Sequence, residues 1–170
     1  MLTTDPYYRS SYVFVTRRDR QLHLRSFDDP ALRKLKVGVQ VLSEEYAPPG
    51  QALGRRGMVG NIVGFETPGE APSAIVNAVL QKRVDAAVVW GPQAGYYARV
   101  HRNELELTPT PAADTPALPM QFSISMAVRR NDHKLRDRLN AILNRRKTEI
   151  DRILRVYGVP LVDEKAKAAD

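Results

Sequence analysis

Over the first hundred residues the chain alternates between two patterns of apolar and polar positions. Short runs rich in β-branched and aromatic residues predict strands at 7–16, 36–42, 61–66 and 84–90. Capping residues, turn signals or apolar positions at helical spacing predict short helices at 30–35, 51–57, 73–80 and 93–100. Because strands and helices alternate, the sequence predicts an open α/β sheet.

The run Val84–Trp90 (VDAAVVW) is a short apolar segment that ends at a turn signal. It is continuously apolar from Ala86 and stops sharply at Gly91-Pro92, which is typical of a strand that is buried on both faces. Ligands of open α/β sheets bind outside the carboxyl ends of the strands. The end of this strand, which carries the only tryptophan, is therefore the first place to look for a ligand site.

The pattern changes after residue 107. The segment Thr108–Pro119 contains four prolines, so we expect an extended connection without regular structure and a candidate domain boundary. Gln121–Arg129 then alternates apolar and small polar residues, which predicts a half-buried strand. Asp132 is positioned to cap a long amphipathic helix that ends at Gly158.

Composition narrows the possible classes of function. The net charge of +7 favours an acidic partner, but the basic residues are spread along the chain without a long run, which disfavours nucleic acid. The absence of cysteine excludes disulfides and thiolate chemistry. No apolar run approaches the ~20 residues of a membrane-spanning helix. The N-terminus lacks the pattern of a signal peptide, which we expect to be absent or already removed.

No set of residues in the sequence predicts catalysis or metal binding. The three histidines are scattered and lack partners at ligand spacing. Glu44 and Glu45 are adjacent on a predicted loop, without a nucleophile or an orienting base nearby. GxSxG, P-loop and GxGxxG motifs are absent as well. We therefore predict a protein that is not an enzyme and that holds no cofactor or metal.

Several blocks of sequence carry a resemblance to a known family. The blocks YYRSSYVFV, KVGV, IVNAVLQKRVDAAVVW and FSISMAVRRND, followed by RVYGVP, resemble in this order the C-terminal two thirds of type-two periplasmic solute-binding proteins. In that family two α/β lobes are joined by two crossing strands. TDPYYRSSYVFV, SFDDPALRKLKVGVQ and VVWGPQAGYYA are similar to a subgroup, the binding-protein-like accessory proteins of PQQ-dependent methanol dehydrogenase systems.

The resemblance implies a division of the chain. Residues 8–113 would form one complete open α/β lobe (lobe two), 118–160 the returning strand and C-terminal helix of an incomplete lobe one, and 161–170 a frayed tail. Family members have further chain for lobe one ahead of this sequence. We therefore expect the apolar sides of the strand Phe122–Val128 and of the last helix to be covered by an N-terminal fragment, another copy of the chain, or a partner.

The resemblance also bears on the ligand. Amino-acid-binding relatives carry an acidic residue just after the strand that here ends at Trp90, and this chain has Trp90-Gly91-Pro92 instead. The difference argues against an amino-acid ligand. An aromatic cleft is one interpretation, and a structural role in the core or in a crossing strand is the other. The candidate cleft residues are Tyr7, Tyr8, Arg9, Trp90, Tyr96 and Tyr97.

Arginines on the last helix are candidates for docking an acidic protein, with an ordinary solvated helix face as the alternative. They are Arg145, Arg146, Arg152 and Arg155. The first functional hypothesis is a non-catalytic periplasmic accessory factor that acts with a PQQ-dependent methanol or alcohol dehydrogenase by protein contact. The alternative is a solute-binding receptor of an ABC transporter for a small ligand that is not an amino acid. The effector domain of a transcriptional regulator would need a helix-turn-helix segment, which is not visible.

Overall fold

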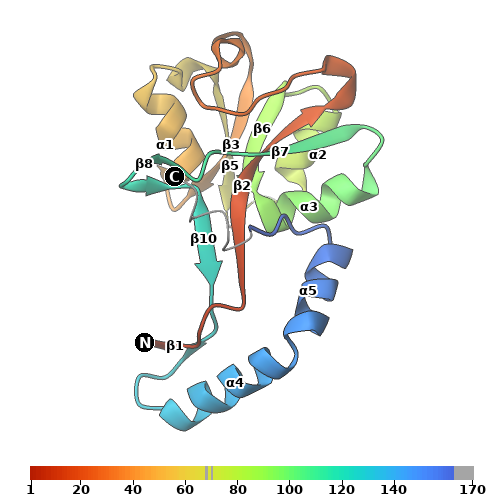
Figure 1. Ribbon diagram of the computed structural model, residues 1–170. Coiled ribbons are helices and arrows are strands. Elements are labelled where there is room, and N and C mark those ends of the chain that lie inside the picture. Colours follow the sequence, from red (N-terminus) through yellow and green to blue (C-terminus); the bar gives the residue numbers. More distant parts are fainter. Residues whose placement is uncertain (68, 70, 163–170) are drawn as a thin grey trace.

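A computed structural model describes residues 1–67, 69 and 71–162. The predicted turn at 67–70 therefore lies partly outside the described residues. The main sheet has seven strands. Five of them lie in the order β5 (Ile62–Thr67), β3 (Val37–Leu42), β6 (Ala86–Trp90), β2 (Tyr8–Arg17) and β7 (Leu105–Pro109). The short β4 (Glu45–Tyr46) pairs with the end of β3, and β10 (Gln121–Ile124) pairs with the first half of β2. β5, β3 and β6 are parallel, while β2 runs antiparallel to β6 and β7. The predicted open α/β sheet is thus confirmed, with a mixed strand direction (Figure 1).

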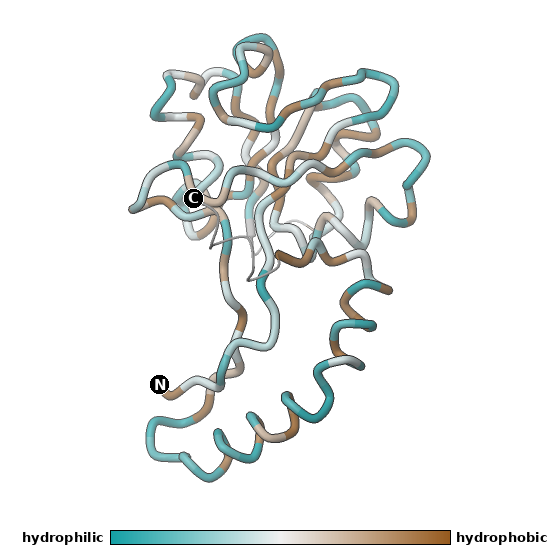
Figure 2. Tube along the Cα trace, in the orientation of Figure 1, coloured by the Kyte–Doolittle hydropathy of each residue, from teal (hydrophilic) through white to brown (hydrophobic). Residues whose placement is uncertain are grey.

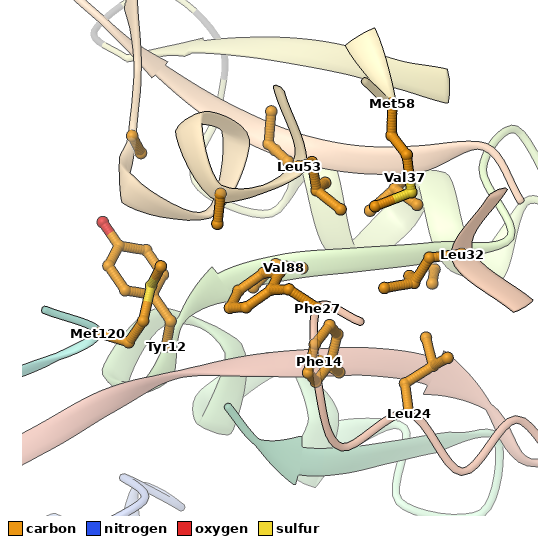
Figure 3. Packing of buried hydrophobic residues seen from close by; sticks show 14 of the residues in the cluster. Tyr12, Phe14, Leu24, Phe27, Leu32, Val37, Leu53, Met58, Val88 and Met120 are labelled. Carbon is orange, nitrogen blue, oxygen red and sulfur yellow. The ribbon is translucent and has the colours of Figure 1, made fainter. Parts of the chain in front are cut away.

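Successive residues of a strand point to opposite sides of the sheet, so the apolar strands place side chains on both faces. Helices and loops cover each of these faces. On one face Phe14 and Val88 pack with α1 (Pro48–Arg55), the 3₁₀ helix η2 (Pro30–Lys34) and neighbouring loops (Figure 3). On the other face Val13 and Val89 pack with α2 (Ala74–Leu80) and α3 (Gly91–Val100). The four residues of β6 before Trp90 are all 0% exposed, which confirms a strand buried on both faces.

The proline-rich segment is more regular than the sequence predicts. β7 extends to Pro109, and β8 (Ala113–Thr115) pairs with β9 (Leu118–Pro119). Proline is compatible with these positions because it stands at strand ends, where no ladder hydrogen bond from its nitrogen is needed. Asp114 fixes the segment to the C-terminal end of α1. Its side chain is 3% exposed and forms ion pairs with Arg55, the last residue of α1, at 3.8 Å and with Arg56, the next residue, at 2.7 Å. The expectation of an irregular connection was therefore wrong.

Two chain segments leave the main sheet side by side. β10 (Gln121–Ile124) pairs antiparallel with the first half of β2, and the small sheet of β1 (Leu2–Thr3) and β11 (Ala127–Val128) follows. The predicted strand 121–129 is interrupted because Met126 bonds to Thr4: its N–H donates to the Thr4 hydroxyl, and its carbonyl accepts from the Thr4 N–H. These segments have the arrangement of crossing strands (Figure 1).

The predicted long helix consists of α4 (His133–Arg145) and α5 (Lys147–Val156), which are separated at Arg146, where ψ is 10°. The Asp132 cap is confirmed, because its carboxylate accepts a hydrogen bond from the Leu135 N–H at 3.1 Å. Gly158, with φ of +72°, follows the last turn as predicted. Together α4 and α5 form an arc that projects away from the main sheet (Figure 1).

The chain after α5 returns to β2. Leu161 forms a bridge with Ser10, the Ser10 hydroxyl donates to the Pro160 carbonyl at 2.7 Å, and the Val162 N–H donates to the Arg9 carbonyl at 3.0 Å. Of the predicted tail 161–170, these first two residues thus lie along the crossing strand, and 163–170 lie outside the described residues. A third segment therefore joins β2 and β10 where they leave the sheet.

Candidate functional site

The carboxyl ends of β3 and β6 lie next to each other, as expected for adjacent parallel strands, and a chain of amide groups connects them. The Trp90 N–H donates to Gln40 Oε1 at 3.2 Å, and Gln40 Nε2 donates to Gln93 Oε1 at 3.0 Å. Gln93 Nε2 in turn donates to the Pro72 carbonyl. Gln40 is only 8% exposed, so its amide is buried and satisfied within the protein. The strand ends thus carry a neutral, internally bonded network.

An aromatic wall stands beside this network. The Trp90 ring meets Tyr12 of β2 edge-on at 5.4 Å between centroids and Phe122 of β10 at 5.8 Å, and Tyr12 and Phe122 are 6.3 Å apart. Edge-to-face contacts at these distances are favourable. Tyr12 is buried, and burial raises the pKa of its phenol, whereas Trp90 and Phe122 are half-buried. The wall lies where both crossing strands meet the main sheet.

The Trp-Gly-Pro sequence has a separate structural reason at each position. Trp90 belongs to the aromatic wall. Gly91 lies against the Ser11 carbonyl, and a Cβ there would also stand 3.0 Å from the Ser10 hydroxyl oxygen, so that the close approach of α3 to β2 requires glycine. Pro92 occupies the first turn of α3, where its missing N–H costs no helical hydrogen bond. The motif therefore places α3 against the crossing strand.

The five aromatic residues of the predicted cleft fall into three groups. Trp90 belongs to the wall. Tyr7 and Tyr8 form an edge-to-face pair where β2 begins, with 5.1 Å between ring centroids. The pKa of Tyr8 is raised mainly by burial and to a smaller extent by the neighbouring Tyr7. Tyr96 and Tyr97 lie on α3, with their rings 5.2 Å apart. Among the described residues, no ring-to-ring contact joins these three groups.

Arg9, the remaining predicted cleft residue, is half-buried in β2. Within the described part of the chain its Nε atom has no hydrogen-bond partner.

The predicted docking arginines are all exposed, but they are also divided. Arg146 forms an ion pair with Glu149 at 2.8 Å, and Arg145 ends α4. Arg152 and Arg155 line a hollow together with Arg99 of α3. Only this second pair shares a concave surface.

Sequence reasoning missed the two glutamines and two members of the wall. Gln40 is the one polar residue among the alternating valines of its strand, and this is the signal that could have indicated a buried amide. Tyr12 and Phe122 lie in predicted strands, but their proximity depends on the antiparallel register of β2 and β10, in which Phe122 pairs with Ser10. A single sequence does not contain that register.

Within the described residues, no group of three or more His, Cys, Asp or Glu side chains could hold a metal ion. In the same part of the chain, no helix is both long enough and apolar enough to cross a membrane.

Crossing strands, a sheet covered on both faces and a helix pair beyond the crossing define the type-two periplasmic binding protein fold. The crystal structure of the periplasmic binding protein XoxJ from Methylobacterium extorquens AM1 matches with a TM-score of 0.82 and 31% identity, over 96% of this chain and 74% of that one. The chain therefore belongs to the MoxJ/XoxJ family of periplasmic binding proteins.

MoxJ sequences agree with this assignment. The chain is 32% identical to MoxJ of Methylorubrum extorquens and 30% identical to MoxJ of Paracoccus denitrificans, in both cases over 95% of its length. It spans 58% and 63% of the lengths of these two proteins. A scan against protein-family models finds no match.

Proposed function

We propose that this protein is a non-catalytic periplasmic accessory factor that acts by protein contact on a PQQ-dependent methanol or alcohol dehydrogenase, in its assembly or its activation. The proposal is supported by the membership of this chain in the MoxJ/XoxJ family, and by the resemblance of the segments around Tyr8 and Trp90 to dehydrogenase-associated accessory proteins. It is also supported by the chemistry of the strand ends.

The neutral network at those strand ends carries the argument. A receptor for amino acids offers charged groups that make charge-assisted hydrogen bonds to the ammonium and carboxylate groups of its ligand. Here the amides of Gln40 and Gln93 bond to each other, to the Trp90 N–H and to the Pro72 carbonyl. A ligand that took these groups would break bonds already made, which costs free energy for each buried amide left unpaired. The ends of β3 and β6 therefore present neutral amides that are already bonded, in place of the charged groups that bind an amino acid.

We also propose the division of the chain into lobe two over 8–113 and part of lobe one over 118–160. The strands β2 to β7 and most of the core on both faces fall in the first range, although Leu118 and Met120 complete the core on one face. The strands β10 and β11 and the helices α4 and α5 fall in the second range. The side chains of Leu135, Ile142 and Ile153 are 42%, 37% and 44% exposed. This apolar face suits cover by a further polypeptide surface: more lobe-one chain, a second copy or a partner.

The accessory function can be tested by reconstitution. The purified chain is immobilised, and binding of a PQQ-dependent methanol dehydrogenase is measured up to micromolar concentrations. The activity of the dehydrogenase is then assayed with and without the chain. We expect saturable binding and a change in activity or in the yield of active enzyme. No association at micromolar concentrations, together with unchanged activity, would overturn the proposal.

A receptor for a neutral solute is the second candidate, favoured by the aromatic wall. Trp90 and Phe122 are half-buried, so part of each ring is available to stack on a ligand. A solute at one hundred times its dissociation constant would stabilise the fold by about 2.7 kcal/mol. A thermal-shift screen of neutral solutes, with Trp90 fluorescence as a second signal, separates the two functions. A strong shift in both signals with one solute favours the receptor.

A further inference from the structure

A groove runs between α3 and α5, away from the aromatic wall. One hollow of about 430 Å³ is lined by Tyr96, Arg99, Val100, Val156 and Tyr157. A second hollow of about 530 Å³ is lined by Arg99, Thr148, Asp151, Arg152, Arg155 and Val156. The two hollows share Arg99 and Val156 and therefore form one surface, which we call the α3–α5 groove. Its two sides come from different regions, the main sheet with its helices and the projecting arc of α4 and α5 (Figure 1).

One half of the α3–α5 groove is apolar. Tyr96 and Tyr157 stack with 6.0 Å between ring centroids and 24° between ring planes. They are 47% and 54% exposed, and Val100 and Val156 beside them are 67% and 47% exposed. Scattered exposed apolar residues are ordinary, but four in one hollow form a contiguous patch. Tyrosine is also among the residues that contribute most to binding in protein interfaces.

The other half of the groove is basic. Arg99, Arg152 and Arg155 are opposed there by a single acidic residue, Asp151. Among the residues that the structure describes, none of the three arginines has a carboxylate within 4.0 Å. Arginine is the cation best suited to carboxylates, because its planar donors bind both oxygens.

The groove also lies in the most positive part of the chain. Residues 133–156 hold eight Lys or Arg against three Asp or Glu, a net charge of +5, which leaves +2 for the other 146 residues. Lys and Arg occupy eight of these 24 positions and 18 of the other 146, whereas Asp and Glu are about as frequent here as elsewhere in the chain. This field attracts an acidic partner to the helices that form one side of the groove.

We propose that the α3–α5 groove docks an acidic segment of a protein partner. An apolar or aromatic side chain of that segment packs against Tyr96 and Tyr157, and flanking carboxylates bind Arg99, Arg152 and Arg155. The apolar patch favours a protein over a bare polyanion, which would use the arginines alone. The inference rests on the proposed function, since the partner is the dehydrogenase. A segment seated there contacts both α3 and α5 and thereby restrains the two regions relative to each other.

Two variants and one matched control test this docking site. Arg152→Glu with Arg155→Glu reverses the basic side of the groove. Lys134→Glu with Arg138→Glu makes the same change in charge at exposed positions of α4 that do not line the groove. Tyr157→Ala removes half of the stacked pair. Far-UV circular dichroism and the thermal midpoint verify that each variant is folded, and binding to a purified PQQ-dependent methanol dehydrogenase is then measured at 50 mM and 500 mM salt.

We expect the groove double variant to raise Kd at least tenfold at 50 mM salt, and at least three times more than the α4 control does. Its effect should shrink at 500 mM, where exposed charges are screened. Tyr157→Ala should raise Kd about tenfold at both salt concentrations, because its contact is apolar. Together these results would support the groove as the docking site.

The opposite outcomes are distinguishable. If the wild type binds and the groove variants bind as the control does, the docking site is wrong and the proposed function stands. If the wild type does not bind, the docking site is overturned, and the proposed function fails as well when the activity of the dehydrogenase is also unchanged. If the groove variants lose binding to phosphatidylglycerol vesicles and keep binding to the dehydrogenase, the surface serves a membrane and the inference is overturned.

Discussion

Two helices of this protein, the mostly apolar α2 and the amphipathic α5, meet different surroundings. α2 lies on the main sheet, and its residues Ile75, Val76 and Val79 are no more than 2% exposed. α5 has no buried residue, and Ile153 on its apolar side is 44% exposed. Figure 2 shows apolar positions recurring along α4 and α5, although both project from the main sheet. Amphipathic periodicity thus specifies which side of a helix is apolar, but burial depends on the surface that faces it.

Truncation of one apolar side chain in each region should give the largest difference in stability. Phe14 is 0% exposed and packs against Phe27 at 5.4 Å between ring centroids. Phe14→Ala should lower the free energy of unfolding by about 3–5 kcal/mol, because a buried ring is lost and a cavity remains. Ile153→Ala should cost about 0.5 kcal/mol or less. Urea unfolding, followed by the fluorescence of Trp90, measures both.

A loss of several kcal/mol in Ile153→Ala would contradict the comparison. It would show that the apolar side of α5 is covered in solution. Repeating the measurement at tenfold higher protein concentration distinguishes a second copy from cover within the chain, because only association depends on concentration.

The contact between α3 and the residues that follow α5 should give the next largest change in stability. A Cβ on Gly95 of α3 would collide with the carbonyl of Gly158, which follows α5. Gly95→Ala should therefore destabilise the protein by about 1–3 kcal/mol and loosen the returning segment. Hydrogen exchange at the Val162 N–H, which donates to the Arg9 carbonyl at 3.0 Å, should become faster.

Gly60 provides the matched control for this substitution. A Cβ there would have no atom within 4 Å, and φ is not positive. Gly60→Ala should leave both the unfolding midpoint and the exchange at Val162 close to the wild type. Unchanged exchange in Gly95→Ala would mean that the returning segment is held by β2 alone.

Within the main-sheet region, the ion pair that holds the proline-rich segment can be weakened selectively. Asp114→Asn removes the carboxylate charge that pairs with Arg56 at 2.7 Å, at a site where the Asp114 side chain is only 3% exposed, and leaves Arg56 with Asp28 as its one charged partner among the described residues. We expect a loss of about 1–2 kcal/mol in urea unfolding. Asp28 pairs with the same arginine at 2.7 Å, but its side chain is 74% exposed, so Asp28→Asn should cost less. Equal losses would show that burial does not determine the strength of these pairs.

Local pattern predicts most of the strands and helices of this fold but not their arrangement. The valines of β3 and the run ending at Trp90 identify buried strands, because apolar residues on both sides of a strand require a layer on each face. The proline-rich segment was predicted wrongly, because Pro109 and Pro119 stand at strand ends and Asp114 bonds to a distant helix. Such a long-range ion pair leaves no periodic signal in the sequence.

The position of the candidate site at the end of β6 could be predicted from the sequence, but the residues that contact Trp90 could not. The end of β6 follows from the topology of α/β sheets, and Trp90 does lie there. The rings that contact Trp90 are those of Tyr12 and Phe122. These two residues are 110 positions apart in the sequence and meet only through strand pairing. Tyr96 is six residues from Trp90 but belongs to the α3–α5 groove with Tyr157. Closeness in sequence is a poor guide where a helix begins directly after a strand.

The smallest expected effect concerns the pH dependence of stability. Burial raises the pKa of Tyr12 above the 10.0 of a free tyrosine. The folded state then holds this proton more tightly than the unfolded state does, so that the associated stability is complete below about pH 10 and is lost as the pH rises through the folded pKa. In urea unfolding followed by circular dichroism, Tyr12→Phe should match the wild type at pH 8 and decline less steeply above pH 10. Tyr157→Phe, whose ring is 54% exposed, should decline as the wild type does. A parallel decline of Tyr12→Phe and wild type would mean that alkaline unfolding starts from another group and that the burial of Tyr12 does not contribute to it.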